Sequence, residues 1–180
     1  TITFTIDPYT TIADNAVVDD VRCNGACDGS IVLAPSGGIG SYSYDWDPVP
    51  PSGQGTTVAL NLCPGVYGVT ITDGVGCEQV FSYTITEPDT IDVEVDLIVD
   101  ASCADAADGA ISITVSGGTP SYCFSWSGPD GFVSQTEDIA GLEPGLYILI
   151  ITDDNGCSYQ LNVIVQALVT VIADAVTTPY

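Results

Sequence analysis

Apolar and polar residues alternate along several short stretches of the chain, a pattern typical of β-strands with one buried face. Aromatic or aliphatic side chains occupy every second position within residues 42–46, 67–71, 122–126 and 147–151. Gly-Gly and Asp-Gly turns separate these stretches, and no part of the sequence keeps a sustained helical period. The pattern therefore predicts an all-β chain.

The sequence repeats itself without a gap at an offset of 80 residues, the separation of Cys23 and Cys103. Residues that coincide at this offset include the pairs Cys77 and Cys157, Trp46 and Trp126, Tyr67 and Tyr147, and Asp73 and Asp153. Chance does not keep tryptophan, cysteine and glycine in register over such a length, so we infer an internal duplication.

The register of the duplication predicts the domain boundaries. Residues 9–88 form a first repeat and residues 89–168 a second, while residues 1–8 are expected to be the last strand of a preceding repeat and residues 169–180 the first strand of a following one. Each repeat has the length, the short strands and the buried tryptophan of an immunoglobulin-like β-sandwich. We therefore expect two tandem immunoglobulin-like sandwiches of about 80 residues within a longer array.

Composition excludes several classes of function. The chain carries 24 acidic residues, one Lys or Arg and no histidine, for a formal net charge of −23. Such a surface repels nucleic acids and anionic membranes, and the usual general base is absent. No apolar run approaches the length of a membrane span, whereas 46% hydrophobic residues suffice for a packed core. We expect no enzyme, no nucleic-acid partner and no membrane insertion.

A series of short motifs follows the first cysteine in each repeat. In the first repeat they read Cys-x(4)-Asp-Gly-Ser-Ile, Ser-Gly-Gly, Tyr-x-Tyr-x-Trp, Pro-Gly-x-Tyr, Thr-Asp-x-x-Gly-Cys and a closing Thr-Glu-Pro. Together they resemble the SprB-type repeat of very large cell-surface adhesins in gliding Bacteroidota. The resemblance covers residues 23–88 and 103–166, and the second repeat departs at Ala110 and at Ala167-Leu168. It implies an array secreted to the cell surface, without catalysis in the repeat itself.

Seven cysteines and no methionine indicate an oxidising, extracellular location. The simplest framework pairs equivalent cysteines within each repeat and leaves Cys123 without a partner. The predicted disulfides are Cys23–Cys77, Cys103–Cys157 and Cys27–Cys63. A second framework, Cys23–Cys27 with Cys63–Cys77, stays open, because Cys23 and Cys77 fall at opposite ends of a simple immunoglobulin topology.

The strands of the second repeat predict an apolar outer face. If Trp126 points inward, Cys123 must point outward, since side chains alternate along a strand. The same alternation directs Ile148, Ile150 and Ile164 outward, whereas the first repeat has Gly68, Thr70 and Thr84 at the equivalent positions. We expect this face of the second repeat to be buried against another copy or another subunit.

Three further assignments concern the ends of the repeats. Ile2, Phe4 and Ile6 alternate as a buried face requires, and we expect them to complete a neighbouring sandwich. A calcium ion at the junction between repeats would take oxygen ligands from these acidic residues: Glu87, Asp89, Asp153 and Asp154. Asp89-Thr90-Ile91 resembles an O-glycosylation motif of Bacteroidota, with Thr90 as the acceptor.

These observations favour a structural repeat of an extracellular surface filament or giant adhesin. Such a segment would be stabilised by disulfides, associate with neighbouring repeats or copies of itself, and support adhesion. The alternative is a calcium- or glycan-binding module of a secreted multidomain protein. No cofactor is expected apart from calcium.

Overall fold

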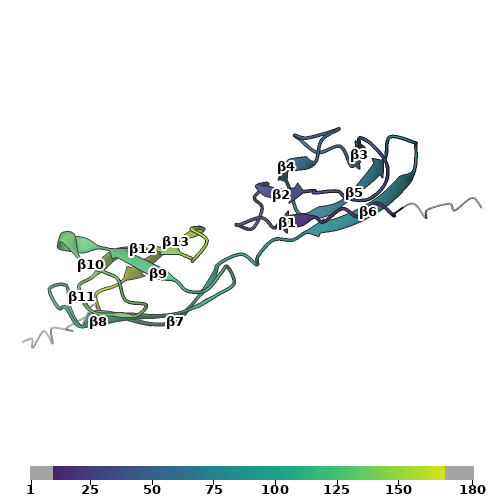
Figure 1. Cartoon of the computed structure of the whole chain (residues 1–180). Helices are drawn as coiled ribbons and strands as arrows, with labels where there is room; N and C mark the ends of the chain where they lie inside the picture. The colour runs from purple at the N-terminus through teal and green to yellow at the C-terminus, as the bar shows by residue number, and fades with distance from the viewer. Residues whose placement is uncertain (1–9, 169–180) are drawn as a thin grey trace, which may run out of the picture. The chain divides into compact units, whose positions relative to one another are not determined.

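The computed structural model describes residues 10–168, and the chain divides into two compact units between Asp89 and Thr90. Each unit is a sandwich of two antiparallel sheets, which appear as two layers of arrows in Figure 1. No α-helix, and no helix able to cross a membrane, occurs within this described part. The predicted strands at residues 1–8 and 169–180 lie outside it.

The first unit consists of a β1-β2-β4 sheet and a β3-β5-β6 sheet. The strands are β1 (Val17–Asp19), β2 (Gly29–Val32), β3 (Ser43–Asp47), β4 (Val58–Leu62), β5 (Gly65–Thr72) and β6 (Glu78–Ile85). The central strand β5 pairs with β3 on one side and with β6 over its whole length on the other. This sheet places the motif-bearing strands next to one another.

The second unit consists of a β11-β8-β7 sheet and a β10-β9-β12-β13 sheet. Its elements are β7 (Asp92–Val99), β8 (Gly109–Ser116), β9 (Cys123–Ser127), the 3₁₀ turn η1 (Pro129–Gly131), β10 (Val133–Ser134), β11 (Ile139–Leu142), β12 (Gly145–Thr152) and β13 (Ser158–Val165). The all-β, immunoglobulin-like fold predicted from the alternation is confirmed in both units.

Each unit packs its own core around one tryptophan. Trp46 and Trp126 are both 1% exposed, and each indole N–H donates to a backbone carbonyl at 3.0 Å. On the strand beside Trp126, the side chains of Tyr147, Leu149 and Ile151 are buried, as the alternation predicts. The tryptophans are therefore core residues, and neither offers an exposed platform for a sugar.

An aspartate at the same place in each repeat ties two loops together. The Asp73 carboxylate accepts backbone N–H groups from Ile39 at 2.9 Å, Val75 at 3.0 Å and Cys77 at 2.8 Å. In the second unit Asp153 accepts from Thr119 at 2.9 Å and from the residue equivalent to Cys77 at 2.8 Å. This contact explains why the Thr-Asp-x-x-Gly-Cys motif recurs in both repeats.

Two glycine motifs recur for a related reason. Gly38 has φ +63°, and a Cβ there would meet the side chains of Asp73 and Ile12 at 3.1 Å. A Cβ on Gly29 would lie 2.9 Å from a methyl group of Ile85, on the opposite sheet. The Ser-Gly-Gly and Asp-Gly motifs therefore mark close approaches within a sandwich.

The Asp73 contact predicts a defined response to acid. The N–H groups donated to the carboxylate, above all that of Cys77, lower the pKa of Asp73 below its ordinary value of 3.8. Because the folded pKa is depressed, this stabilisation is present above pH 3.8 and is lost as the pH falls through the lower folded value. Asp73→Asn is therefore expected to melt below wild type at neutral pH and to approach wild type in acid.

Differential scanning calorimetry across a pH series measures this difference in melting temperature. The control is Asp154→Asn, which changes an exposed acid in the next residue after the equivalent Asp153. A gap between wild type and Asp73→Asn that stays constant down to strongly acidic pH would contradict the assignment.

Candidate interaction surface

The outer face of the β10-β9-β12-β13 sheet carries an apolar patch. Leu146, Ile150 and Ile164 are 47%, 44% and 61% exposed, and Ile148 is half-buried. The strand register places Leu146 opposite Ile164, so the two side chains are direct neighbours on adjacent strands. The outward directions predicted for Ile148, Ile150, Ile164 and Cys123 are confirmed.

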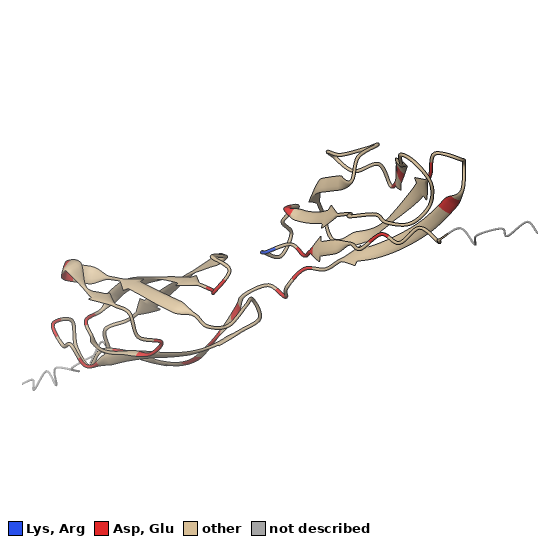
Figure 2. Ribbon diagram, viewed as in Figure 1, with Lys and Arg blue, Asp and Glu red and all other residues tan. Residues whose placement is uncertain are grey.

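The remaining positions of this outer face are polar but uncharged. They are occupied by Cys123, Ser125, Ser127, Thr152, Ser158, Gln160 and Asn162. Figure 2 draws the acidic residues in red, and no red segment lies on β12 or β13. In a chain with 24 acidic residues, this face therefore stands out as free of carboxylates.

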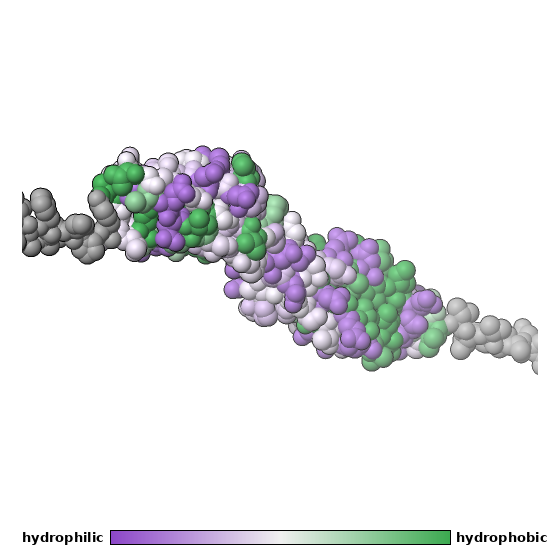
Figure 3. Space-filling model, turned by 90° about the vertical axis from the view of Figure 1, so that its right-hand side faces the viewer, coloured by the Kyte–Doolittle hydropathy of each residue, from purple (hydrophilic) through white to green (hydrophobic). Residues whose placement is uncertain are grey.

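The equivalent face of the first unit differs in both respects. Asp45, Asp47 and Glu78 belong to it, because they alternate with the inward side chains of β3 and β6. Gly68 and Thr70 replace the two central isoleucines. Figure 3 shows hydrophobic surface on both units, with the broader area on the second unit. The apolar, uncharged outer face is thus a property of the second unit.

Sequence reasoning missed two members of this patch. Leu146 follows the same alternation as Ile148 and could have been found from it. Val133 is exposed on the two-residue strand β10 and pairs with Ser127, which brings it onto the same face. No alternating pattern marks so short a strand, and therefore only the strand pairing reveals Val133.

The cysteine framework predicted from the repeat is wrong for two of its three pairs. Cys27 and Cys63 form a disulfide with an S–S distance of 1.96 Å, as predicted. Cys77, Cys103 and Cys123 carry free, exposed thiols, which rules out both Cys23–Cys77 and Cys103–Cys157. The Cys27–Cys63 bond also rules out the alternative framework.

Topology explains why those pairs do not form. Cys77 immediately precedes β6, while the chain around Cys23 lies at the far end of that strand, where Val21 donates to the carbonyl of Thr86 at 3.1 Å. Eight strand residues span roughly 26 Å, whereas a disulfide needs Cα atoms about 4–7 Å apart. The second unit separates Cys157 from Cys103 by β13 in the same way.

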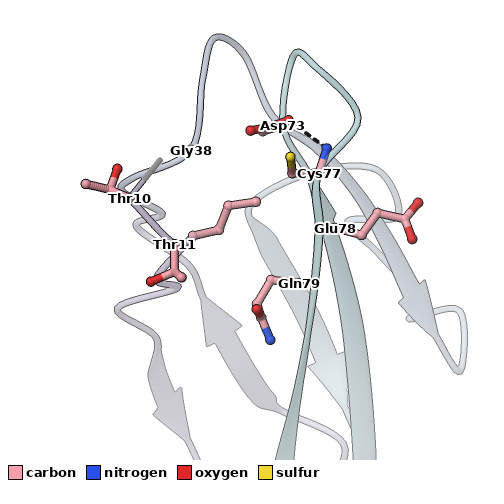
Figure 4. Close-up of a pocket in the computed structure, with 8 residues that line it drawn as sticks. Thr10, Thr11, Gly38, Asp73, Cys77, Glu78 and Gln79 are labelled. Carbon is pink, nitrogen blue, oxygen red and sulfur yellow. Dashed lines mark hydrogen bonds between the residues drawn. The ribbon is translucent and has the colours of Figure 1, made fainter. Parts of the chain in front are cut away.

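A small hollow opens beside Cys77 at one end of the first unit. Its volume is about 180 Å³, and Thr10, Thr11 and Ile12 line one side while the start of β6 lines the other. Figure 4 shows Glu78 and Gln79 pointing to opposite sides of this strand. The second unit has Tyr159 at the position of Gln79, and this ring packs against the core. The hollow therefore reflects a packing difference between the repeats.

The acidic residues assigned to calcium have other roles or none that the structure identifies. Asp153 uses both carboxylate oxygens for backbone N–H groups, and Glu87 accepts the N–H of Gly25 at 2.6 Å. Across residues 10–168, no group of three or more acidic or cysteine side chains is arranged to hold a metal ion. Calcium binding by Glu87, Asp89, Asp153 and Asp154 stays a prediction without structural support.

Two further predictions are not tested by the structure. Thr90 is exposed in the segment between β6 and β7, and its glycosylation stays a prediction. Ile2, Phe4 and Ile6 lie outside the described residues, so completion of a neighbouring sandwich by this segment also stays a prediction.

Two tandem immunoglobulin-like sandwiches, one with an apolar outer face, define an all-β repeat protein. A profile of the SprB repeat matches residues 15–50 and 97–131, one segment in each unit. The resemblance found in the motifs is thereby confirmed, and each unit carries an SprB-type repeat. A comparison with curated proteins finds no match.

Solved structures of other proteins align with this chain. The three N-terminal domains of the outer capsid protein Hoc of bacteriophage RB49 align with a TM-score of 0.52 at 16% identity, over 87% of this chain and 59% of that one. The insect immune protein hemolin aligns with a TM-score of 0.39 at 19% identity, over 87% of this chain and 47% of that one. At 16% identity the Hoc alignment concerns the fold alone, and this chain spans about three fifths of the Hoc chain.

Proposed function

We propose that the chain is a structural repeat segment of an extracellular cell-surface adhesin or filament. The observation that carries the proposal is the SprB repeat match in both units, each within its own sandwich. Repeats of this kind contact mainly their neighbours, so their number sets the length of an array without changing its construction. The net charge of −23 keeps such an array soluble and away from anionic surfaces.

A non-catalytic role agrees with how the buried carboxylates are used. Asp73 and Asp153 are the buried acidic residues of the described part, and both accept backbone N–H groups that hold loops in place. A carboxylate engaged in this way has a structural role, because its oxygens already accept hydrogen bonds from backbone N–H groups. The proposal therefore assigns no reaction to either repeat.

The outer face of the second unit supports lateral association of the chain. Several large aliphatic side chains on one uncharged sheet face exceed the scattered exposure that a monomer tolerates. Burial of such a face against another copy removes apolar surface from water without burying a carboxylate. We assign this contact to Ile148, Ile150 and Ile164, with Cys123 close to its border.

Labelling of intact cells tests the proposed location. Antibodies raised against the folded chain are expected to label the surface of unpermeabilised cells of the producing bacterium, viewed by immunogold electron microscopy. Antibodies against a cytoplasmic protein of the same cells serve as the control. Labelling that appears only after permeabilisation would refute the surface assignment.

A further inference from the structure

We propose that β13 pairs edge to edge with β13 of a second copy of the chain, so that two second units share one continuous sheet. The proposal rests on the lateral association proposed above and names its strand and its partner. It concerns the free backbone edge of β13, which is distinct from the apolar side chains on the outer face of the sheet.

Within the described residues 10–168, β13 is the terminal strand of its sheet. In the order β10-β9-β12-β13 its strand neighbour is β12. Just beyond its C-terminal end, the backbones of Gln166 and Leu168 pair with Ala101, which closes that end of the outer edge. Eight consecutive residue pairs, from Gly145↔Val165 to Thr152↔Ser158, join the two strands without a register shift. Before that bridge, the outer edge of β13 is regular and has no strand partner among the described residues, and it presents alternating N–H and C=O groups.

β13 also lacks the features by which proteins protect exposed edges. Charged residues, proline, bulges and short length all discourage pairing with a foreign strand. The sequence of β13, Ser-Tyr-Gln-Leu-Asn-Val-Ile-Val, contains no charge, no proline and no glycine. The 61% exposed Ile164 adds apolar surface directly beside the edge.

Every other terminal strand within residues 10–168 has at least one of these protective features. β1, β3, β4, β10 and β11 are five residues long or shorter. β7 carries Asp92, Glu94 and Asp96 and a register shift between Val95 and Leu97. β6, the counterpart of β13 in the first unit, begins with Glu78. The contrast between β6 and β13 indicates that the second repeat has an edge suited to pairing.

Charge identifies the partner as a second copy. Two chains of −23 each repel one another, so they can approach closely only where neither contributes a carboxylate. The residues of β13 and the outer face beside it meet this condition. A carboxylate lies only past the end of the strand, where Asp100 accepts the N–H of Gln166 at 2.8 Å and is thereby occupied. Antiparallel pairing of two identical strands also satisfies two-fold symmetry, which matches each free N–H with a C=O of the other copy.

Hydrogen exchange of the full chain, combined with analytical ultracentrifugation, tests the proposal. On raising the chain concentration into the associating range, the backbone amides on the free side of β13 are expected to become protected. The double variant Gln160→Glu/Asn162→Glu places like charges along the paired strands and is expected to raise the dimer Kd about tenfold or more. Because both side chains also lie on the outer face, the protection of the β13 amides is the readout that identifies the edge contact. Val80→Glu/Ser82→Glu adds the same charges at the equivalent positions of β6 and is the matched control.

The outcomes separate the edge contact from lateral association in general. Association without added protection of β13 amides overturns edge pairing and leaves contact through the outer face in place. An equal loss of association in the β6 control also overturns it, because the effect would then come from net charge. A chain that stays monomeric at all concentrations refutes edge pairing and lateral association together, while surface labelling would still test the structural role. The melting of the second unit shows that the double variant is folded.

Discussion

Replacing Cys27 and Cys63 with alanine is expected to destabilise the first unit by about 4 kcal/mol. The disulfide closes a loop with a sequence separation of 36 residues, and the chain-entropy estimate for a loop of this size gives that value. For a domain of this size the loss corresponds to a melting temperature lower by roughly 20 °C. Calorimetry of the full chain measures the change in the transition of the first unit.

The second unit supplies the internal control for this experiment. It has Ala107 and Glu143 where the first unit has Cys27 and Cys63, and so its transition should not move. If the double variant melts within a few degrees of wild type, the disulfide does not contribute as its loop length implies.

Ile150→Asp is expected to abolish lateral association of the chain. Ile150 is 44% exposed at the centre of the apolar outer face, so the substitution leaves the core intact but places a carboxylate in the contact. A buried charge without a partner costs several kcal/mol, which corresponds to an increase in the Kd of roughly a hundredfold or more. Sedimentation equilibrium of wild type and variant measures the difference.

Thr70→Asp is the matched control, because Thr70 occupies the equivalent position in the first unit and faces the same way. It adds the same charge and should leave association unchanged. Salt offers a second check, since screening weakens the repulsion between two acidic chains and should strengthen wild-type association. Unchanged assembly of Ile150→Asp would place the contact on another surface.

Most of the correct predictions from the sequence came from the alternation of apolar and polar side chains along the strands. It identified the inward tryptophans, the buried side of β12 and the outward isoleucines, because side-chain direction on a strand depends only on position. The sequence repeat at an offset of 80 residues likewise indicated two similar units. The SprB-type motifs marked real constraints, such as the Asp73 carboxylate that holds two loops.

Properties that depend on strand order were beyond the sequence. The predicted pairing of Cys23 with Cys77 followed from repeat symmetry. The sequence had already raised the objection that the two residues lie at opposite ends of an immunoglobulin topology, but only the strand order of this chain decides between the two arguments. The open edge of β13 depends on which strand is terminal in its sheet, and Val133 reaches the outer face only through the pairing of β10. In each case the deciding contact joins residues far apart in the chain.

The Cys27–Cys63 bond makes the two repeats unequal as mechanical elements. When tension acts on the ends of the first unit, the loop between Cys27 and Cys63, with a sequence separation of 36, cannot extend. The disulfide joins the two ends of that loop and carries the force across it. At about 3.4 Å per extended residue, that loop withholds roughly 120 Å of contour length. The second unit has no bond at the equivalent positions, Ala107 and Glu143, and can release the corresponding length. An array that alternates such repeats would combine stiff links with links that lengthen under load.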